Sequence, residues 1–416
     1  MARSARPRRH YRTSAPLYAE GVQPFVAQGR AFLTEIMVEA GLKVRVDAAG
    51  NLIGRLDGAD PNLGPIAIGS HSDTVQGGGR FDGIAGVIAG IAVARVLGQN
   101  GGLEHPLEVI DFLAEEPSDF GLSCIGSRGM AGLLDEGMLA MASPDGGLLR
   151  DALRQVGGDP EALSSAVRQD LAAFIEMHIE QGPVLEARGL DIGVVSSIVG
   201  IRRIEIVFEG VAAHAGTAPM DLRQDAAFAG ALALVAVREL AEALASEGPE
   251  YFVATVGILE VKPGGSNVVP NLCRLVIDAR SSDRTMTDRF EAGINEASHD
   301  AAKRARVNRS AFKTLSDGFP ASCSEGIREA IRAAAQTLGL SAIDIASGAG
   351  HDAAFIAQVC PAGMIFIPCL RGMSHTPDEW STREQLAAGA AVMLQAVLSI
   401  DSTGAYFSSS PGFTQL

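Results

Sequence analysis

Short runs of apolar residues alternate along this chain with longer amphipathic stretches. Four of these runs are bulky and lack polar alternation, which is typical of strands buried on both faces of a sheet. The first run is followed by the glycines at 77–79 and by an apolar helical pattern over about 83–97. Strands that alternate with helices predict an α/β fold, a mainly parallel sheet flanked by helices. The four runs lie at residues 65–70, 107–113, 172–177 and 363–368.

The middle of the chain has a different pattern. Ile204, Ile206 and Phe208 alternate with charged residues, so this segment is predicted to be a strand with one face in water. A helix, two strands, a second helix and a last strand are predicted after it, and this β-α-β-β-α-β order indicates a ferredoxin-like α+β fold. The predicted helices cover about 221–245 and 283–306, and the strands lie near 252–261, 268–280 and 311–315.

These two patterns predict two domains, the second inserted into the first. Residues 1–198 and 318–416 would form the larger domain, and residues 199–317 the insert. Gly318 and Pro320 mark the segment that returns the chain to the larger domain. A length of 416 residues agrees with this division, because one domain usually holds roughly 100–200 residues.

The composition excludes several classes of protein. Lysine and arginine number 34 against 49 aspartates and glutamates, and the formal net charge of −15 argues against a nucleic-acid-binding surface. No apolar run approaches the ~20 residues that a membrane span needs. The five cysteines are never spaced as CxxC, which argues against a disulfide framework or a thiolate zinc site and favours the cytoplasm. The basic first dozen residues and the segment from Ser402 to Leu416 are expected to be loose ends.

Side chains that can bind a metal ion follow each of the four buried runs. Because ligands of open α/β sheets gather at the carboxyl ends of the strands, we expect these side chains to converge. One histidine at a strand end is more often a structural residue, but four such strand ends together indicate a site. The residues are His71, Asp73 and Asp82 after the first run, Glu115 and Glu116 after the second, His178 after the third and His375 after the fourth.

The donor types limit the kind of site. Imidazole and carboxylate without thiolate indicate a catalytic centre for Zn²⁺ or Mn²⁺, with Co²⁺ and Ni²⁺ as alternatives. The available donors exceed the needs of one cation, whereas two cations that share a bridging carboxylate would use them. One carboxylate should stay unligated to take a proton from water, and Glu115 and Glu116 could divide these duties. The alternative is that this pair belongs to a solvated acidic loop.

Three other positions have both a functional and a structural interpretation. Arg280 ends an apolar strand, where a cation is costly without a partner, and its planar guanidinium suits a substrate carboxylate. The alternative is an ion pair with Asp278 or Asp283. His214 lies in a turn of small residues that permits close approach of a substrate or another chain. The dipeptide His351-Asp352 either orients the site or caps a helix.

Six segments occur in an order that matches a known family. They are Gly69-Ser-His-Ser-Asp-Thr-Val75, Phe81-Asp-Gly83, Glu115-Glu-Pro117, His178-Ile-Glu-Gln-Gly-Pro183, His214-Ala-Gly-Thr-Ala-Pro-Met220 and Ser347-Gly-Ala-Gly-His-Asp-Ala353. Over roughly residues 30 to 400 the chain thereby resembles the hydantoinase/carbamoylase branch of the dimetal amidohydrolases, relatives of aminoacylases and dimetal carboxypeptidases. Members of this branch include N-carbamoyl-L-amino acid hydrolases, β-ureidopropionases and allantoate amidohydrolases.

The resemblance implies two divalent cations and a ligand set for them. His71 and His178 would hold one cation, Glu116 and His375 the other, and Asp82 would bridge both. The larger domain would be the dimetal catalytic domain, and the insert would be the lid and dimerisation domain of a homodimer.

The resemblance also implies roles for residues around the cations. Glu115 would be the general base, and Asp73 would hold His71 in the right tautomer. His214 would stabilise the oxyanion, in some relatives from the partner subunit. The positions that match substrate-binding residues of the family are Gln181, Asn267 and Arg280.

The reaction that this resemblance predicts is hydrolysis of the ureido C–N bond of an N-carbamoyl-L-amino acid, a small substrate with a carboxylate. Allantoate amidohydrolase is the main alternative, because allantoate also carries a carboxylate and ureido groups. An aminoacylase or dipeptidase is less favoured, and a catalytically silent binding protein is the alternative from another class. One segment departs from the family: Pro117-Ser118-Asp119-Phe120 stands where members frequently have Gly-Ser-Arg-Phe, which changes the charge beside the site.

Overall fold

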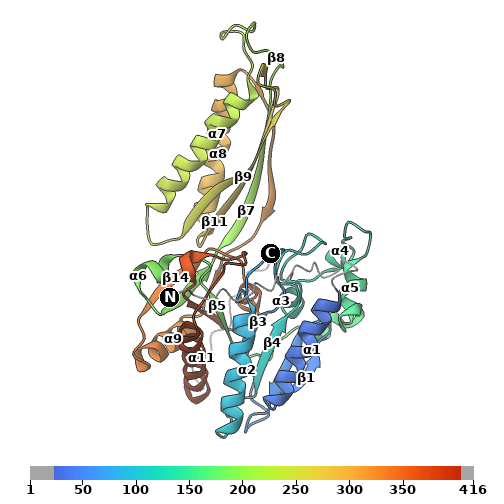
Figure 1. Ribbon diagram of the computed structural model, residues 1–416, viewed down its shortest axis with the longest axis vertical. Helices are drawn as coiled ribbons and strands as arrows, with labels where there is room; N and C mark the ends of the chain where they lie inside the picture. The colour runs from blue at the N-terminus through green and yellow to red at the C-terminus, as the bar shows by residue number, and fades with distance from the viewer. Residues whose placement is uncertain (1–22, 404–416) are drawn as a thin grey trace, which may run out of the picture. The chain divides into compact units, whose positions relative to one another are not determined.

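The computed structural model describes residues 23–403 (Figure 1). The chain forms two compact units. The first comprises the described parts of Met1–Ser196, Cys323–Ile345 and His351–Leu416, and the second comprises Ser197–Ser322 and Ala346–Gly350. The last helix continues to Thr403, so the tail expected from Ser402 would begin later. The expectations for the first dozen residues and for the tail beyond Thr403 lie outside the described residues.

A nine-stranded mixed sheet forms the centre of the first unit. Its middle strands are parallel neighbours in the order β4 (Leu107–Phe112), β3 (Ile66–His71), β5 (Ala173–Ile179) and β15 (Ala362–Ile367). They correspond to the four apolar runs, and every residue in them is buried, which confirms the predicted α/β architecture. Further strands extend the sheet on both sides, namely β1 (Lys43–Val46), β2 (Leu52–Leu56), β6 (Ile192–Ile198), β13 (Ala321–Ser322) and β14 (Ala342–Ser347).

Helices cover both faces of this sheet. On one face, α2 (Ile84–Gln99), α9 (Glu325–Thr337) and α11 (Arg383–Thr403) share an apolar core with alternate residues of the strands, and α1 (Gln23–Glu39) packs on β1 and β2. On the other face, α10 (Ala353–Ile356) contacts β5, β15 and α3 (Ile125–Met130). Short helices in the connections are α4 (Glu136–Leu139), α5 (Leu149–Gln155), α6 (Val184–Arg188) and the 3₁₀ turns Pro160–Ser165 and Leu370–Gly372.

One helix within the described residues, α11, is long and apolar enough to cross a membrane by length and composition. Its apolar side chains instead contribute to the core of the first unit, where Val392, Met393 and Val397 are fully buried. The apolar composition of α11 is therefore that of a core helix.

The second unit has the predicted β-α-β-β-α-β order. Its antiparallel sheet has the strand order β12 (Asn308–Asp317), β7 (Gly200–Glu209), β11 (Leu272–Ser281) and β9 (Phe252–Lys262). The helices α7 (Ala226–Ala245) and α8 (Arg284–Ala305) bury their apolar faces against the sheet. A separate pair of short strands, β8 (Ala213–His214) and β10 (Val268–Val269), precedes α7 and β11 in the chain.

Two element boundaries in this unit differ from the expectation. The first helix begins at Ala226 rather than near Asp221, because the Asp225 carboxylate caps it by accepting the Ala227 and Phe228 N–H groups at 3.0 and 3.2 Å. The strand expected over 268–280 is divided at Pro270, which has no N–H to donate to a ladder.

Candidate metal centre

The residues predicted to bind metal lie at the carboxyl ends of the parallel strands. His71 is the last residue of β3, and His178 is the penultimate residue of β5. Glu116 follows β4, His375 follows β15, and Asp82 lies in the loop between β3 and α2. The structure brings these five side chains together in two groups that share Asp82.

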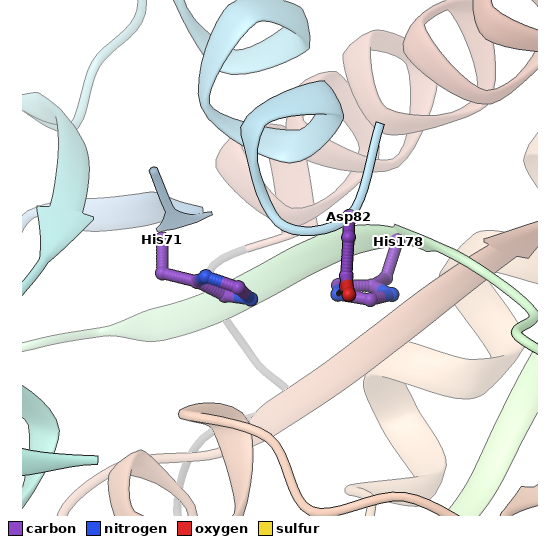
Figure 2. A group of neighbouring side chains, drawn as sticks. All are labelled: His71, Asp82 and His178. Carbon is purple, nitrogen blue, oxygen red and sulfur yellow. Dashed lines mark ion pairs between the residues drawn. The ribbon is translucent and has the colours of Figure 1, made fainter. Parts of the chain in front are cut away.

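The first group consists of His71, Asp82 and His178, whose side chains Figure 2 shows pointing toward one another. Each residue offers one ligand atom, and these atoms lie within 4.8 Å of one another. The distance between His178 Nε2 and Asp82 Oδ1 is 3.1 Å. All three residues are buried, although a charge or an imidazole is costly to remove from water without a partner.

A glycine lets the Asp82 loop approach the first group. Gly83 has a φ of 63°, and a Cβ at this position would lie 2.4 Å from the ring of His71. Any other residue would therefore strain the backbone and displace the imidazole. This contact explains why Asp82 is followed by glycine.

The second group consists of Asp82, Glu116 and His375. His375 Nε2 lies 3.1 Å from Asp82 Oδ2 and 3.5 Å from Glu116 Oε1. The Asp82 oxygens thus face different histidines, Oδ1 toward His178 and Oδ2 toward His375. A carboxylate in this position can bridge two cations.

The donor atoms fit a pair of divalent cations. Ligand atoms arranged tetrahedrally at about 2.0–2.2 Å from one zinc ion are about 3.3–3.6 Å apart. The distances of 3.1 and 3.5 Å around His375 Nε2 are similar. Glu116 Oε1 is buried and has no hydrogen-bond partner within the described part of the chain, and a cation would satisfy it. Nitrogen and oxygen donors without sulfur are compatible with Zn²⁺ or Mn²⁺.

Two carboxyls at the site have pKa values shifted in opposite directions. Burial opposes ionisation of Asp82, but hydrogen bonds with His178 and His375 outweigh it and hold the pKa of this carboxyl well below its usual range. Burial raises the pKa of Glu115 well above its usual value; the charge of His71 opposes this rise and the charge of Asp352 adds to it. An ionised Asp82 can bind a cation, and a Glu115 with a raised pKa can accept and release a proton.

Asp73 connects the loops that carry His71 and Glu116. Its main-chain oxygen lies 3.0 Å from His71 Nδ1, while its carboxylate is 3.5 Å from that nitrogen. The same carboxylate accepts the N–H groups of Glu115 and Glu116 at 3.2 and 3.1 Å. Asp73 therefore orients His71 mainly through its backbone and positions the glutamate pair through its side chain.

Glu115 is buried beside the first group without belonging to either group. Its Oε2 lies 3.6 Å from His71 Nε2, and its Oε1 is 3.6 Å from the Cys124 thiol. Ala114 and Cys124 both adopt positive φ, and the Cys124 N–H donates to the Glu115 carbonyl at 2.9 Å. The turn around Glu115 is thus held in a specific conformation by the start of α3.

Gln181, a predicted substrate-binding residue, lies next to the ligands. Its amide nitrogen donates to Asp82 Oδ1 at 3.1 Å and to Ser374 Oγ at 3.2 Å. Gln181 thereby contacts the carboxylate that the two groups share, and its backbone has a positive φ of 55°.

The substrate-binding residues predicted in the insert lie at opposite ends of the second unit. His214 in β8 pairs with Val268 in β10, and Asn267 accepts the Ala215 N–H through its carbonyl at 2.8 Å. Arg280 lies at the far end of β11, eight residues beyond Leu272. At about 3.3 Å per residue this separation is about 26 Å. One chain therefore does not bring His214 and Asn267 to Arg280.

Arg280 has the ion pair that the structural interpretation predicted, and it retains free donors. Its Nε and Nη2 contact the Asp278 carboxylate at 2.7 and 3.4 Å, and its Nη1 donates to the Gly348 carbonyl at 2.9 Å. A guanidinium has five N–H groups, so one on each terminal nitrogen can still bind a carboxylate end-on. The ion pair holds the guanidinium in one orientation and leaves that side for a ligand.

Other residues lie around the site, and the sequence analysis missed two of them, Glu379 and Glu176. Glu379 is buried and accepts N–H groups from the Asp82 loop, and Glu176 accepts the Ser70 hydroxyl at 2.7 Å beneath the sheet end. His351 packs edge-on against His178 with ring centroids 4.6 Å apart, and the Asp352 side chain makes no helix-capping hydrogen bond. His351 thus contacts a predicted ligand, while Asp352 stands at the N-cap of α10 without a side-chain capping bond. A single sequence does not mark the contacts of Glu379 and Glu176, because each depends on a distant segment.

Comparisons with known proteins agree with this geometry. Residues 67–399 match peptidase family M20/M25/M40. The chain is 42% identical over 386 residues to an N-carbamoyl-L-amino-acid amidohydrolase of Paenarthrobacter aurescens. This match covers 91% of this chain and 92% of that relative. It is 39% identical over 383 residues to a ureidoglycolate hydrolase of Arabidopsis thaliana, with coverages of 89% and 80%.

Solved structures show the same relationship. A crystal structure described as an amidase of the hydantoinase/carbamoylase family from Burkholderia multivorans has a TM-score of 0.85 and 34% sequence identity, with 94% of this chain and 92% of that chain covered. The matches span both units. The chain belongs to peptidase family M20/M25/M40, within its hydantoinase/carbamoylase branch, and is a hydrolase of amide C–N bonds.

Proposed function

We propose that this enzyme hydrolyses the ureido C–N bond of N-carbamoyl-L-amino acids and releases ammonia, carbon dioxide and the amino acid. The observation that carries the proposal is the pair of ligand groups sharing Asp82, with Glu115 unligated beside them. The 42% identity to an N-carbamoyl-L-amino-acid amidohydrolase supports the choice of substrate.

The proposed ligands divide between two cations. His71 and His178 would hold one cation, Glu116 and His375 the other, and Asp82 both, in agreement with the two groups. When bound, Zn²⁺ or Mn²⁺ would polarise the ureido carbonyl and make water more acidic. Co²⁺ and Ni²⁺ are compatible with the same nitrogen and oxygen donors.

Glu115 is proposed to move the proton. A water molecule adds its oxygen to the ureido carbon while Glu115 takes its proton, and Glu115 then gives that proton to the nitrogen as the C–N bond breaks. Ammonia leaves, and the remaining carbamate loses carbon dioxide. Burial raises the pKa of Glu115, which suits a group that must hold the proton between these two steps.

Three charged or polar side chains of the second unit are proposed to contact the substrate. Arg280, with Asp278 orienting it, would bind the α-carboxylate through its free terminal N–H groups. His214 would donate to the oxygen that becomes negative, and Asn267, which precedes β10 and accepts the Ala215 N–H, would bind the carboxylate together with Arg280.

We infer a homodimer through β9, the edge strand of the second unit. Val253, Ile258, Leu259 and Val261 are 37–50% exposed along this eleven-residue strand. A long apolar edge with unpaired backbone groups is a surface that folded proteins normally cover. A two-fold axis would pair the same edge of two copies, so that each covers the other.

This pairing would also complete the substrate site. If the two copies of β9 run antiparallel about Gly257, Val253 lies opposite the partner's Val261. Arg280 is beside Val253 in its own sheet. Asn267 follows the other end of β9, which closes with Lys262, and His214 is held beside it by the pairing of β8 with β10. The partner's His214 would therefore lie at the Arg280 end, which removes the separation of about 26 Å found within one chain.

A panel of ureido compounds tests the substrate. With Mn²⁺ supplied, we expect N-carbamoyl-L-methionine to be hydrolysed with a kcat/KM at least tenfold above that for allantoate, ureidoglycolate or N-carbamoyl-β-alanine. Allantoate and ureidoglycolate also combine a carboxylate with ureido groups, and the ureidoglycolate hydrolase relative makes them the leading alternatives. Higher turnover of either would reassign the substrate, and activity only on acyl amino acids or dipeptides would exclude the ureido class.

We also propose that the enzyme acts in the cytoplasm. All five cysteines are buried and none forms a disulfide, which fits a reducing compartment.

A further inference from the structure

Glu379 connects two loops that carry proposed metal ligands. It lies four residues after His375 and is 1% exposed. Its Oε1 accepts the N–H groups of Arg80, Phe81 and Asp82 at 2.8, 2.8 and 3.1 Å. One carboxylate oxygen thus holds three consecutive backbone groups of the loop that ends in the bridging ligand.

The other carboxylate oxygen is also engaged. Glu379 Oε2 accepts the Ser374 hydroxyl at 2.9 Å, and Ser374 Oγ lies 3.3 Å from Asp82 Oδ2. Ser374 precedes His375 in the chain. The carboxylate therefore contacts the backbone on the Asp82 side and the side chain on the His375 side.

The loop before Asp82 approaches this carboxylate closely at Gly79. A Cβ on Gly79 would lie 2.0 Å from Glu379 Cδ and Oε1, so only glycine allows the loop to approach this closely. A buried carboxylate is stable here because hydrogen bonds replace its lost hydration. These contacts fix the position of the loop relative to the segment that carries His375.

We propose that Glu379 is a positioning residue that sets Asp82 and His375 at the spacing required for one shared cation. The proposal rests on the dimetal centre proposed above and assigns Glu379 no contact with substrate. Outer hydrogen-bond partners of metal ligands typically change metal affinity by about 10–100-fold when they are removed. The effect should fall mainly on the cation held by Asp82, Glu116 and His375, because Glu379 contacts two of the three ligand loops.

Asp401 provides a matched control in the same unit. Its carboxylate also accepts two consecutive backbone N–H groups of a distant loop, those of Glu104 and His105, at 3.1 and 2.9 Å. Neither that loop nor Asp401 contributes to the two ligand groups. A purely structural effect of losing a carboxylate contact to a distant loop should appear in variants of both residues.

The test measures metal affinity and apo-protein stability in E379A, E379Q and D401N. Full-length apo-protein is titrated with Mn²⁺ and with Zn²⁺ by calorimetry, and its Tm is measured without metal. We expect E379A to weaken the second cation by about 10–100-fold. E379Q keeps an oxygen for the three N–H groups and should lose less, whereas D401N should bind both cations within twofold of wild type. If E379A does not fold, the comparison of E379Q with D401N decides.

Three results would overturn the proposal. Wild-type affinity in the Glu379 variants, with two cations bound to wild type, would remove Glu379 from metal positioning and leave the proposed function intact. An equal loss of affinity in D401N would make the effect a general consequence of loop destabilisation. Failure of the wild-type protein to bind a second cation would instead refute the dimetal centre, and the role of Glu379 with it.

Discussion

At the scale of single residues, two adjacent glutamates have different surroundings. Glu116 Oε1 lies 3.5 Å from His375 and belongs to a ligand group, whereas Glu115 Oε2 faces His71 and belongs to neither group. Successive residues in a turn can point in different directions, and the Asp73 carboxylate fixes this turn by accepting both of their N–H groups. These contacts support the proposal that Glu116 binds a cation and Glu115 transfers the proton, a choice that the residue types alone left open.

The substitution E115Q separates proton transfer from metal binding. The amide has nearly the same shape but cannot take a proton from water, so we expect kcat to fall by about 10²–10⁴-fold. Metal content, measured by plasma emission spectroscopy on the same sample, should stay at the wild-type value. Turnover near that of wild type would show that another group is the base.

The substitution H71A tests the first ligand group. Because His71 is one of three donors with Asp82 and His178, its loss should remove about one of two bound cations per chain. Metal analysis after dialysis measures this occupancy. H299A, on an exposed position of α8, serves as the control and should keep both cations. Equal metal content in the two variants would contradict the assignment of His71.

At the scale of elements, the two edge strands of the second unit allow a direct comparison. Leu259 on β9 and Leu315 on β12 are both 50% exposed, and each lies on an outer strand of the same sheet. The dimer proposed here uses only β9. The two leucines therefore provide a test in which exposure and chemistry are matched.

We expect L259K to dissociate the dimer and L315K to leave it intact. A lysine on this edge puts a charge into a surface that pairing would bury, and so opposes association. Sedimentation velocity over a range of protein concentrations measures the oligomeric state. L259K should also lower kcat/KM if the partner's His214 acts at the Arg280 end. A monomeric wild-type protein, or dissociation by L315K alone, would refute the use of β9.

At the scale of the whole molecule, the chain is acidic, and a buried cation finds carboxylate partners that offset its lost hydration. Arg202 in the second unit is 3% exposed and contacts Asp317, Asp288 and Glu291 at 2.9, 2.8 and 2.6 Å. Burial opposes ionisation of Asp317, but hydrogen bonds from Arg202 and Arg284 outweigh it and lower the pKa of this carboxyl. A carboxyl with a lowered pKa stabilises the folded state above its unfolded pKa and loses this effect as the pH falls.

Asp317 should therefore contribute to stability at neutral pH and not in strong acid. We expect D317N to have a lower Tm than wild type, by a constant difference between about pH 8 and 5. The difference should shrink as the pH falls below about 4, where the unfolded chain binds a proton at this carboxyl before the folded protein does, and it should vanish once the folded carboxyl is protonated as well. Thermal unfolding followed by circular dichroism measures both. D300N, which removes a solvent-exposed pair with Lys303, should stay close to wild type at every pH.

Much of the fold could be predicted from the chain alone. The four apolar runs became the parallel strands β3, β4, β5 and β15, and the insert has the expected order of elements. These features depend on the burial of one segment at a time, which the alternation of apolar and polar residues records directly. Element boundaries were less accurate, since the start of α7 depends on the cap at Asp225 and the break before β11 on Pro270.

The candidate ligands could also be anticipated from sequence, because side chains at the carboxyl ends of parallel strands converge whatever the loops do. Metal-binding residue types at four such ends, together with the six matching segments, were sufficient to name His71, Asp82, Glu116, His178 and His375.

Only the tertiary structure decided the contacts between distant loops. Nothing local distinguishes Glu379 from a surface glutamate, since its role arises from N–H groups that lie 297–299 residues earlier in the chain. The separation of His214 from Arg280 likewise depends on the length of β11 and on the pairing of β8 with β10. Periodicity reports which face of a segment is buried, but the position of one loop against another follows from packing that many distant residues determine together.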